Sequence, residues 1–289
     1  MKPNSFEYVR ANSLGDALAV LSEHGDEAKI LAGGQSLIPT MNMRFAAPEV
    51  LVDIDAIPEL KDIHVSDGFL RIGAMARHVD VLNSPEVAQH APIISLAMPL
   101  IAHSTIRNRG TFGGSLCNAD PASELPACTL ALDAVFNIRS AAGSRTVIAN
   151  EFFLGTYTTC LAENEMLVSV DVPLKKDNTL SFFDEVSRRK GDYAMAGLAA
   201  KAELQNGRLA NARLVFFGVS EIAVSSPSAE SLLNAQDLSD IQVESVYHAI
   251  ADDITPYDDL TTSGDSKLVI MKTLLKRAIA SFIDQGGSQ

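Results

Sequence analysis

The chain has 289 residues, 47% of them hydrophobic, and a formal net charge of −13 at pH 7. This size and composition predict a soluble globular protein with one extended core or two separate ones. The negative charge argues against nucleic acid as a partner, because phosphate backbones are bound at basic surfaces. No apolar run approaches the roughly 18 to 20 residues that span a bilayer, and the N-terminus lacks an export signal, so no membrane insertion and a cytoplasmic location are expected.

The three cysteines, Cys117, Cys128 and Cys160, are odd in number and have no C-x-x-C spacing. This pattern indicates neither a disulfide framework nor a zinc or iron–sulfur ligand set, and small buried side chains are expected instead. The acidic pairs Asp252-Asp253 and Asp258-Asp259 lack the spacing of a calcium loop. They are interpreted as exposed polar positions, and no metal site is predicted.

The first predicted elements are a helix and a strand. Ser13 is placed to cap a helix, with Asp16 three residues on and apolar residues at helical spacing as far as Gly25. A short buried strand over residues 28–32 then leads into a glycine loop at 33–36, and a short helical turn follows. The predicted order is therefore strand, glycine loop, helix.

The rest of the first half is predicted to be a mixture of helices and strands. Strands are predicted at 50–54, 69–73, 134–138 and 166–172, and helices at 93–101 and 124–132. A second glycine loop, Thr111-Phe112-Gly113-Gly114-Ser115, is expected between the two helices.

The second half has a different pattern. Residues 173–179 are polar and charged, which marks a domain boundary. Two predicted strands, 194–204 and 208–219, flank Asn206-Gly207, a dipeptide that suits a type I′ hairpin turn because both central residues need a positive φ. A long amphipathic helix is predicted over 265–282.

The two glycine loops have the composition of an anion site. Consecutive backbone N–H groups without side chains can surround a pyrophosphate, and the hydroxyl of Ser36 and the start of the following turn add to the attraction. A Gly-Gly pair also serves as a simple tight turn, and neither a G-x-G-x-x-G nor a P-loop spacing is present. The residues alone thus predict either two turns or a two-loop phosphate cradle of unspecified ligand.

Three ordered stretches resemble the FAD-binding medium subunits of the xanthine dehydrogenase and carbon monoxide dehydrogenase family. They read AGGQSLIPTMNMRFAAPEVLVDIDAIPEL (32–60), IRNRGTFGGSLCNADPASELP (106–126) and RRKGDYA (188–194). The resemblance covers nearly the whole chain. It implies an α+β fold: a two-part FAD-binding domain of the p-cresol methylhydroxylase type over 1–176, with subdomains of about 1–55 and 56–176. A smaller α+β domain with an antiparallel sheet and helices, of the CO dehydrogenase flavoprotein type, is implied over 177–289.

The resemblance also implies the residues that bind FAD. It places the pyrophosphate at Ala32–Ser36 and Thr111–Ser115. It makes Asp120 and Glu124 acceptors of hydrogen bonds from the cofactor and puts Tyr193 close to the isoalloxazine. The implied contacts are Ile30, Leu31, Ala32, Gly33, Gly34, Gln35, Ser36, Leu37, Ile101, Ala102, Thr111, Gly113, Gly114, Ser115, Asn118, Asp120, Glu124, Leu167 and Tyr193. No residue is implied to be an acid–base catalyst.

Two positions depart from the family pattern. Gln35 stands where some relatives have histidine, which in the broader flavoprotein fold can attach flavin covalently. An amide nitrogen cannot form that bond, so non-covalent FAD is expected. Ser266-Lys267 aligns with a Tyr-Arg pair of many relatives, and no role is carried over to it.

The function implied by the resemblance is electron transfer within a larger oxidoreductase. In the family, electrons leave the substrate at a molybdopterin cofactor on a large subunit and cross [2Fe-2S] clusters on a small subunit. They then reach FAD on the medium subunit, which passes them to an external acceptor. Relatives form heterotrimers that pair into dimers. Neither the organic substrate nor the acceptor, whether NAD, quinone, oxygen or another, follows from this sequence.

Two other functions are weighed against this one. A stand-alone FAD-dependent oxidase or dehydrogenase of the same fold would need a substrate-binding cap and an active-site base. The short second half, which is poor in histidine and has no tryptophan, disfavours that reading. A structural subunit that has lost its flavin is disfavoured because both glycine loops are intact.

A few further side chains have two interpretations. His78 and His103 have no carboxylate at a fixed spacing, so solvated or capping roles are favoured over proton transfer. Cys117 is interpreted as a packing residue rather than a flavin contact. The arginines at 107, 109, 188 and 189 either form solvated salt bridges or anchor FAD or a partner subunit.

Overall fold

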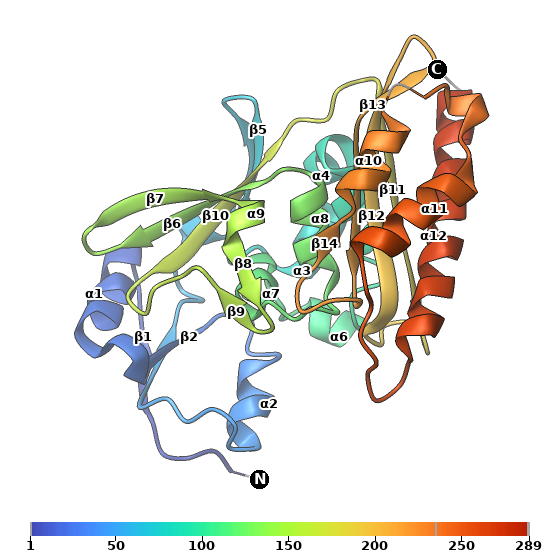
Figure 1. Ribbon diagram of the computed structural model, residues 1–289. Coiled ribbons are helices and arrows are strands. Elements are labelled where there is room, and N and C mark those ends of the chain that lie inside the picture. The colour runs from blue at the N-terminus through green and yellow to red at the C-terminus, as the bar shows by residue number, and fades with distance from the viewer. Residues whose placement is uncertain (1, 235, 288–289) are drawn as a thin grey trace.

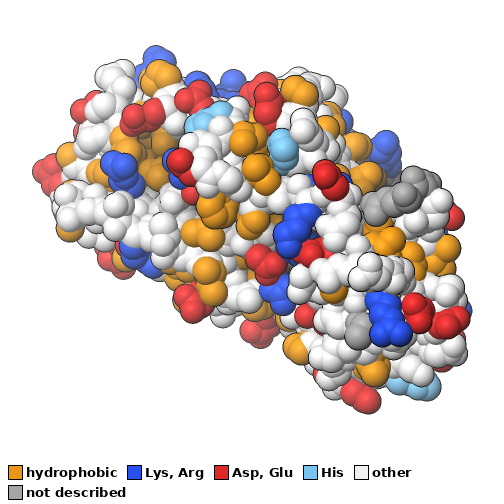
Figure 2. Space-filling view, turned by 90° about the horizontal axis from the view of Figure 1, so that it is seen from above, with side chains coloured by type: hydrophobic (Ala, Val, Ile, Leu, Met, Phe, Trp, Pro, Cys, Tyr) orange, Lys and Arg blue, Asp and Glu red, His pale blue; other side chains and the backbone are white. Residues whose placement is uncertain are grey.

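The computed structural model describes residues 2–234 and 236–287, so Met1 and residues 288–289, the ends of the two predicted domains, lie outside the described residues. The first half of the chain forms two lobes, each with its own sheet, and the second half adds a third sheet beside them (Figure 1). No helix in the described part of the chain is long and apolar enough to span a membrane. Acidic, basic and apolar side chains are interspersed on the face seen in Figure 2.

The N-terminal lobe is a parallel three-stranded sheet in the order β1-β3-β2. Its elements are β1 (Glu7–Arg10), α1 (Leu14–His24), β2 (Ala28–Leu31), α2 (Leu37–Asn42) and β3 (Val50–Asp53). The predicted cap of α1 is confirmed: Ser13 Oγ accepts the Asp16 N–H, and the Asp16 carboxylate accepts the Ser13 N–H. The predicted order of strand, glycine loop and helix is also confirmed.

The second lobe is an antiparallel five-stranded sheet in the order β4-β5-β10-β6-β7, covered by short helices. Its strands are β4 (Ile63–Ser66), β5 (Phe69–Gly73), β6 (Val135–Ser140), β7 (Gly143–Ile148) and β10 (Met166–Pro173), beside a hairpin of β8 (Phe153–Gly155) and β9 (Thr158–Thr159). Its helices are α3 (His78–Asn83), α4 (Pro85–His90), α5 (Pro92–Ala97), α6 (Ser104–Arg107), α7 (Phe112–Asn118), α8 (Glu124–Ala131) and α9 (Ala149–Phe152).

Two elements of this lobe differ from the prediction. The helix predicted over 93–101 is α5, which ends at Ala97. Beyond it the chain turns at Ala102, which adopts a φ of 47°, and the Arg107 guanidinium donates to the carbonyl oxygens of Ile101 and Ala102, each at 2.9 Å. The loop predicted at 111–115 is the start of α7, with Thr111 as its N-cap.

The second half of the chain forms an antiparallel sheet in the order β11-β12-β13-β14. Its elements are β11 (Thr179–Ser187), β12 (Ala194–Gln205), β13 (Arg208–Phe217), β14 (Val224–Ser225), α10 (Pro227–Leu233), α11 (Val243–Asp253) and α12 (Gly264–Gly286). The predicted hairpin is confirmed, since Asn206 and Gly207 have φ values of 52° and 78°. The predicted C-terminal helix is α12, which buries Met271, Leu275 and Phe282 in the core of this domain.

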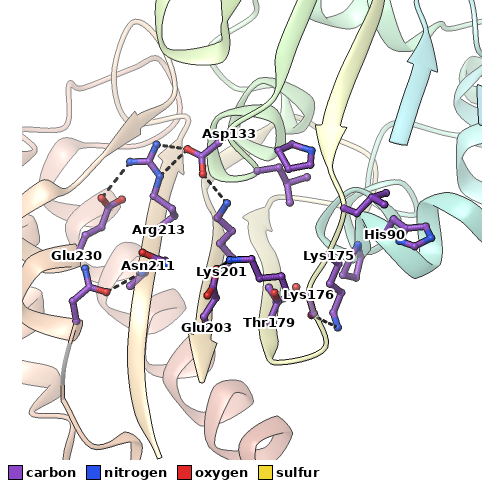
Figure 3. A pocket seen from close by; sticks show the side chains of 17 residues that line it. His90, Asp133, Lys175, Lys176, Thr179, Lys201, Glu203, Asn211, Arg213 and Glu230 are labelled. Carbon is purple, nitrogen blue, oxygen red and sulfur yellow. Dashed lines mark hydrogen bonds and ion pairs between the residues drawn. The ribbon is translucent and has the colours of Figure 1, made fainter. Parts of the chain in front are cut away.

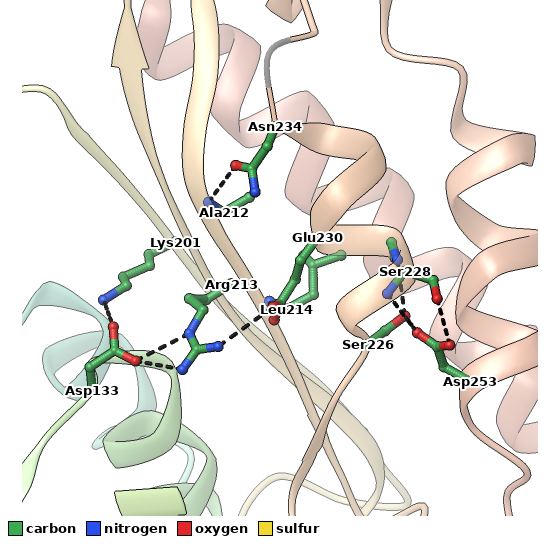
Figure 4. Close-up of polar contacts among 11 residues, drawn as sticks. Asp133, Lys201, Ala212, Arg213, Leu214, Ser226, Ser228, Glu230, Asn234 and Asp253 are labelled. Carbon is green, nitrogen blue, oxygen red and sulfur yellow. Dashed lines mark hydrogen bonds and ion pairs between the residues drawn. The ribbon is translucent and has the colours of Figure 1, made fainter. Parts of the chain in front are cut away.

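The C-terminal sheet lies between two layers of helices. Helices α10 and α12 pack on one face, and α5 and α8 of the second lobe pack against β11, β12 and β13 (Figure 1). Phe183 and Phe217, whose ring centroids are 5.6 Å apart, belong to the same core as the second lobe. Asp133 adds ion pairs across this contact to Lys201, at 2.7 Å, and to Arg213 (Figure 4). The two halves therefore share a core and an ionic network.

Candidate cofactor-binding site

The first glycine loop offers four consecutive backbone N–H groups. Between β2 and α2, the N–H groups of residues 33–36 donate to no acceptor in the part of the chain that the structure describes. Gly34 has a φ of 71°, a conformation that glycine adopts without steric cost. The Gln35 side-chain amide donates to the Gly33 carbonyl oxygen at 2.9 Å and so tightens the turn. A row of unpaired N–H groups of this kind attracts an anion.

The second motif cannot act as a second row of this kind. Thr111 Oγ1 accepts the Gly114 N–H at 3.2 Å, and the other backbone N–H groups of residues 112–115 donate to protein carbonyl oxygens. Gly113 is required by close approach, because a Cβ there would lie 2.6 Å from the Cβ of Ala74. The expectation that both loops use the same chemistry is therefore wrong. The second motif presents hydroxyl side chains and the bare surface of a helix turn.

The two motifs nevertheless lie against each other. A Cβ on Gly33 would lie 2.5 Å from the carbonyl oxygen of Arg109 and 2.8 Å from the Cα of Gly110. A Cβ on Gly114 would lie 3.6 Å from the Cβ of Ala32. The open N–H groups of the first loop thus sit beside the first turn of α7, where no side chain blocks approach.

Asp120 brings together side chains from separate segments. Its Oδ1 accepts the Ala122 N–H at 2.9 Å and its Oδ2 accepts the Tyr157 hydroxyl at 3.1 Å. Tyr193 shares this environment, because partial burial and the charge of Asp120 raise the pKa of its phenol to about 12. Two of the predicted contacts, Asp120 and Tyr193, are therefore neighbours. Tyr157, which the sequence did not indicate, is the third member of the group.

A buried carboxyl pair lies next to this group. Glu124 is 6% exposed at the start of α8, and burial and the charge of Glu185 raise its pKa to about 8. Glu185 lies on β11, where burial and the charge of Asp184 raise its pKa to about 7. Its Oε2 atom is buried and has no hydrogen-bond partner among residues 2–234 and 236–287. The pair therefore includes one buried oxygen whose hydrogen-bonding capacity the described residues leave unused.

The other predicted contacts lie around these groups. The turn after α5 holds Ile101 and Ala102, and a Cβ on Gly191 would lie 2.8 Å from the Ala102 carbonyl oxygen, so the loop before Tyr193 packs on that turn. Ile30, Leu31 and Leu37 flank the first loop, and Ser115 and Asn118 lie on α7. Leu167, on β10, is 2% exposed and belongs to the core of the lobe. The structure does not bring Leu167 to the surface that the others form.

A cavity of about 430 Å³ runs along the first glycine loop. Besides the loop itself, it is lined by Asp53, Asp55, Arg77 and Arg109. Arg77 is paired there with Asp55, and Asp53 adds a second carboxylate, so the two arginines give this cavity no net positive charge. Attraction of an anion therefore rests on the open N–H groups of the loop.

A larger cavity, of about 530 Å³, lies between the second lobe and the C-terminal sheet (Figure 3). Lys176 is paired there with Glu203, and Lys201 and Arg213 are paired with Asp133. Because these cations already have partners and no predicted cofactor contact lines this cavity, we assign it no part in cofactor binding.

The remaining sequence candidates have structural roles. Burial lowers the pKa of His78 to about 4, and its Nε2 lies 3.0 Å from the Thr111 carbonyl oxygen, so the neutral ring supports the second motif. Burial raises the pKa of Cys117 to about 12, which leaves it a protonated packing residue. Asp259 pairs with the buried Lys267 at 2.8 Å, and Asp258 accepts the Gly264 N–H at 2.7 Å, so both aspartates hold the start of α12.

These residues fit the chemistry of FAD. Its pyrophosphate needs close backbone donors, which residues 33–36 supply next to a glycine surface at Gly114. Its hydroxyl and ring N–H groups need acceptors, and the Asp120 carboxylate has acceptor capacity beyond its two hydrogen bonds. The donor row and the acceptors lie on different segments, as a long dinucleotide requires.

Comparison with known proteins agrees with this chemistry. A family model described as "FAD binding domain in molybdopterin dehydrogenase" matches residues 4–175, and one described as "CO dehydrogenase flavoprotein C-terminal domain" matches residues 181–282. The chain is 39% identical to the 6-hydroxypseudooxynicotine dehydrogenase complex subunit alpha of Paenarthrobacter nicotinovorans, over 97% of this chain and 95% of that one. It is 37% identical to the carbon monoxide dehydrogenase medium chain of Hydrogenophaga pseudoflava, over 96% and 97%.

Solved structures show the same fold. A chain of carbon monoxide dehydrogenase from Hydrogenophaga pseudoflava, in a form that lacks the Mo-pyranopterin moiety of the molybdenum cofactor, matches with a TM-score of 0.94 at 37% identity, over 98% of this chain and 99% of that one. A chain of quinoline 2-oxidoreductase from Pseudomonas putida 86 matches with a TM-score of 0.92 at 35% identity, over 99% of both chains. The chain therefore belongs to the FAD-binding medium subunits of the molybdenum hydroxylases: it is the FAD-carrying, electron-transferring subunit of a multi-subunit oxidoreductase.

Proposed function

We propose that the chain holds one FAD without a covalent bond between the first glycine loop and α7, and relays electrons from iron–sulfur clusters of a partner subunit to an external acceptor. The observation that carries this proposal is the row of four open N–H groups at residues 33–36, beside the bare surface at Gly114. In this assignment the loop binds the pyrophosphate, Asp120 and Glu124 accept hydrogen bonds from the cofactor, and Tyr193 lies at the isoalloxazine. Gln35 supports the non-covalent mode because its amide cannot attach flavin.

Bound FAD supplies the redox chemistry, while the protein supplies binding and orientation. The N–H groups of residues 33–36 offset the pyrophosphate charge, which a chain with a net charge of −13 would otherwise repel. Burial raises the pKa of Glu124 to about 8 and that of Glu185 to about 7, so near neutral pH either carboxyl can carry a proton and donate a hydrogen bond. Tyr193 is neutral near pH 7, as any tyrosine of ordinary pKa is, and burial and the charge of Asp120 raise its pKa further, to about 12. No side chain of this site is assigned to acid–base chemistry on the organic substrate.

The partners belong to the proposal as well. We assign the molybdopterin to a large subunit and the [2Fe-2S] clusters to a small one, with assembly as a dimer of heterotrimers in the cytoplasm. The names of two relatives support a multi-subunit assembly, since they denote a complex subunit and a medium chain. Domain limits of 1–176 and 177–289 are supported by the two family matches, which end at 175 and begin at 181.

The test compares the chain alone with the chain assembled with its partner subunits. Acid precipitation of the loaded protein should release the flavin into the supernatant, and flavin that stays with the precipitate would show a covalent bond. Dithionite should reduce the flavin of the chain alone, whereas no hydroxylase substrate should do so until both partner subunits are added. Rapid anaerobic bleaching of the isolated chain by an organic substrate would favour a stand-alone flavin dehydrogenase instead.

A further inference from the structure

The hairpin of β8 and β9 reaches the segment that carries Asp120. Tyr157, at the tip of the hairpin, makes two hydrogen bonds to that segment. Its backbone N–H donates to the Ala119 carbonyl oxygen at 3.0 Å, and its phenol donates to Asp120 Oδ2 at 3.1 Å. One residue thus holds both the backbone before Asp120 and the carboxylate itself.

The backbone on both sides of this contact is constrained. Tyr157 and Ala119 have φ values of 54° and 48°, which residues with a Cβ rarely adopt and which persist where surrounding contacts hold them. On the other side of Asp120, the Gly218 N–H of the C-terminal domain donates to the Pro121 carbonyl oxygen at 2.8 Å. The segment 119–121 is therefore held from two domains.

Packing of the tyrosine ring does not account for this arrangement. Tyr157 is 62% exposed, so its ring buries little surface, and Asp120 is the partner of its hydroxyl. Asp120 itself is 8% exposed and also accepts the Ala122 N–H at 2.9 Å. An ionised carboxylate has about four lone-pair directions, so with both oxygens held Asp120 still has acceptor capacity in a defined direction.

We propose that Tyr157 is a positioning residue of the cofactor site, which acts on FAD by holding the Asp120 carboxylate in the orientation that accepts a hydrogen bond from the cofactor. The inference rests on the proposed FAD site, in which Asp120 is a cofactor contact. Without the phenol, the Asp120 carboxylate can rotate. Binding of FAD then has to fix its orientation, and this loss of conformational entropy weakens the affinity for FAD.

Tyr157→Phe removes the hydroxyl and keeps the ring. Asp120→Asn replaces the carboxylate that accepts the hydrogen bond from this hydroxyl. Tyr247→Phe on α11 is the matched control, because this ring faces Lys272 and lies in the core of the C-terminal domain. The dissociation constant for FAD and the visible flavin spectrum are measured on the full chain and on the assembled complex, which gives readouts that do not depend on activity. Thermal stability of the flavin-free chain is measured in parallel.

Tyr157→Phe should raise the dissociation constant roughly 3- to 10-fold, the size of one net hydrogen bond, and should shift the flavin spectrum. Tyr247→Phe should change neither. The double variant should bind no more weakly than Asp120→Asn alone, because the tyrosine acts through that carboxylate.

Each other outcome overturns part of the argument. If Asp120→Asn impairs FAD binding and Tyr157→Phe leaves binding and spectrum unchanged, the role of Tyr157 fails and the FAD site stands. If Asp120→Asn is also without effect, the placement of FAD at Asp120 fails as well. Additive losses would mean that Tyr157 acts on FAD directly, and a loss confined to thermal stability would make it merely structural.

Discussion

Gly33 and Arg109 are in direct backbone contact: a Cβ on Gly33 would lie 2.5 Å from the Arg109 carbonyl oxygen. The first glycine loop and the segment before α7 are thus in contact without room for a side chain, although Gly33 and Arg109 are 76 positions apart in the sequence.

Gly33→Val should therefore displace the loop and its open N–H groups, and FAD retention should fall at least about tenfold, a loss of ~1.4 kcal/mol. Secondary structure should survive, since the loop lies outside helices and strands. Flavin content and circular dichroism of the purified variant measure the two effects. Gly15→Val on α1 is the control, because a Cβ there would meet only Ser13 Oγ, at an ordinary 3.7 Å, and no positive φ is needed. Normal flavin content in Gly33→Val would mean that the loop is only a turn.

Gly114→Val tests the other side of the cradle. A Cβ there would lie 2.6 Å from Thr111 Oγ1, which caps α7, and would also point toward Ala32. Loss of FAD is expected together with a small fall in thermal stability, on the order of 1 kcal/mol for a lost cap. Calorimetry and flavin content give both values. Retention of FAD with only the stability loss would remove α7 from the site.

The carboxyl pair should make the stability of the flavin-free chain depend on pH. The pKa values of Glu124 and Glu185 are raised to about 8 and about 7 in the fold, so the folded state keeps protons that the unfolded state has released. Stability should fall as pH rises from about 5 to about 8 and then level off. Melting curves between those values test this.

Glu124→Gln is the matched variant for that experiment. It keeps the size of the side chain and cannot ionise, so it should melt higher than the wild type at pH 8, by roughly 2–4 °C for each kcal/mol recovered. The two proteins should converge near pH 5. A constant difference at all pH values would show that Glu124 does not titrate in this range.

Lys267 should contribute to the stability of the C-terminal domain. It is fully buried, its Nζ lies 2.8 Å from Asp259 Oδ2 in an ion pair, and it stands 3.9 Å from the centre of the Tyr257 ring. Burial acts to raise the pKa of Asp259, but the ion pair with Lys267 and the hydrogen bonds from Thr261 outweigh it and hold the pKa well below its usual range.

Lys267→Met should cost about 1–3 kcal/mol, less than a fully buried pair because Asp259 is partly exposed. The depressed pKa of Asp259 means that this contribution is present from pH 5 to pH 8 and is lost only in stronger acid. Thermal unfolding at several pH values checks both points. Lys272→Met on the same helix, which breaks the exposed pair with Glu244, should change little. Equal losses in the two variants would contradict a special role for the buried pair.

Local chemistry made some elements predictable from the residues. The Ser13–Asp16 cap and the Asn206-Gly207 turn are each decided by side chains and φ values within four residues. Helix α7 was missed because two adjacent glycines disfavour a helix by propensity, whereas the fold requires them: Gly113 must pack on the Ala74 backbone. The tertiary contact of Gly113 thus outweighs the low helix propensity of glycine.

The site was predictable only in part for the same reason. Family resemblance supplied Asp120, Glu124 and Tyr193, but Tyr157 reaches Asp120 across 37 positions and through a hairpin. Glu185 comes from the other half of the chain, and nothing in its sequence neighbourhood predicts that it lies near Glu124. Contacts of this range depend on how the domains pack, which no local pattern contains.

The bond from Gly218 to Pro121 has a consequence for how such proteins can be recombined. A chimaera that joined the N-terminal lobes of this chain to the C-terminal domain of a relative would inherit the glycine loop intact. It would nevertheless bind flavin well only if the donor supplied a backbone N–H at the position of Gly218, which needs a φ of 74°. The two domains should therefore be exchanged together. A chimaera that lacks the hydrogen bond from Gly218 to Pro121 should fold but retain little flavin.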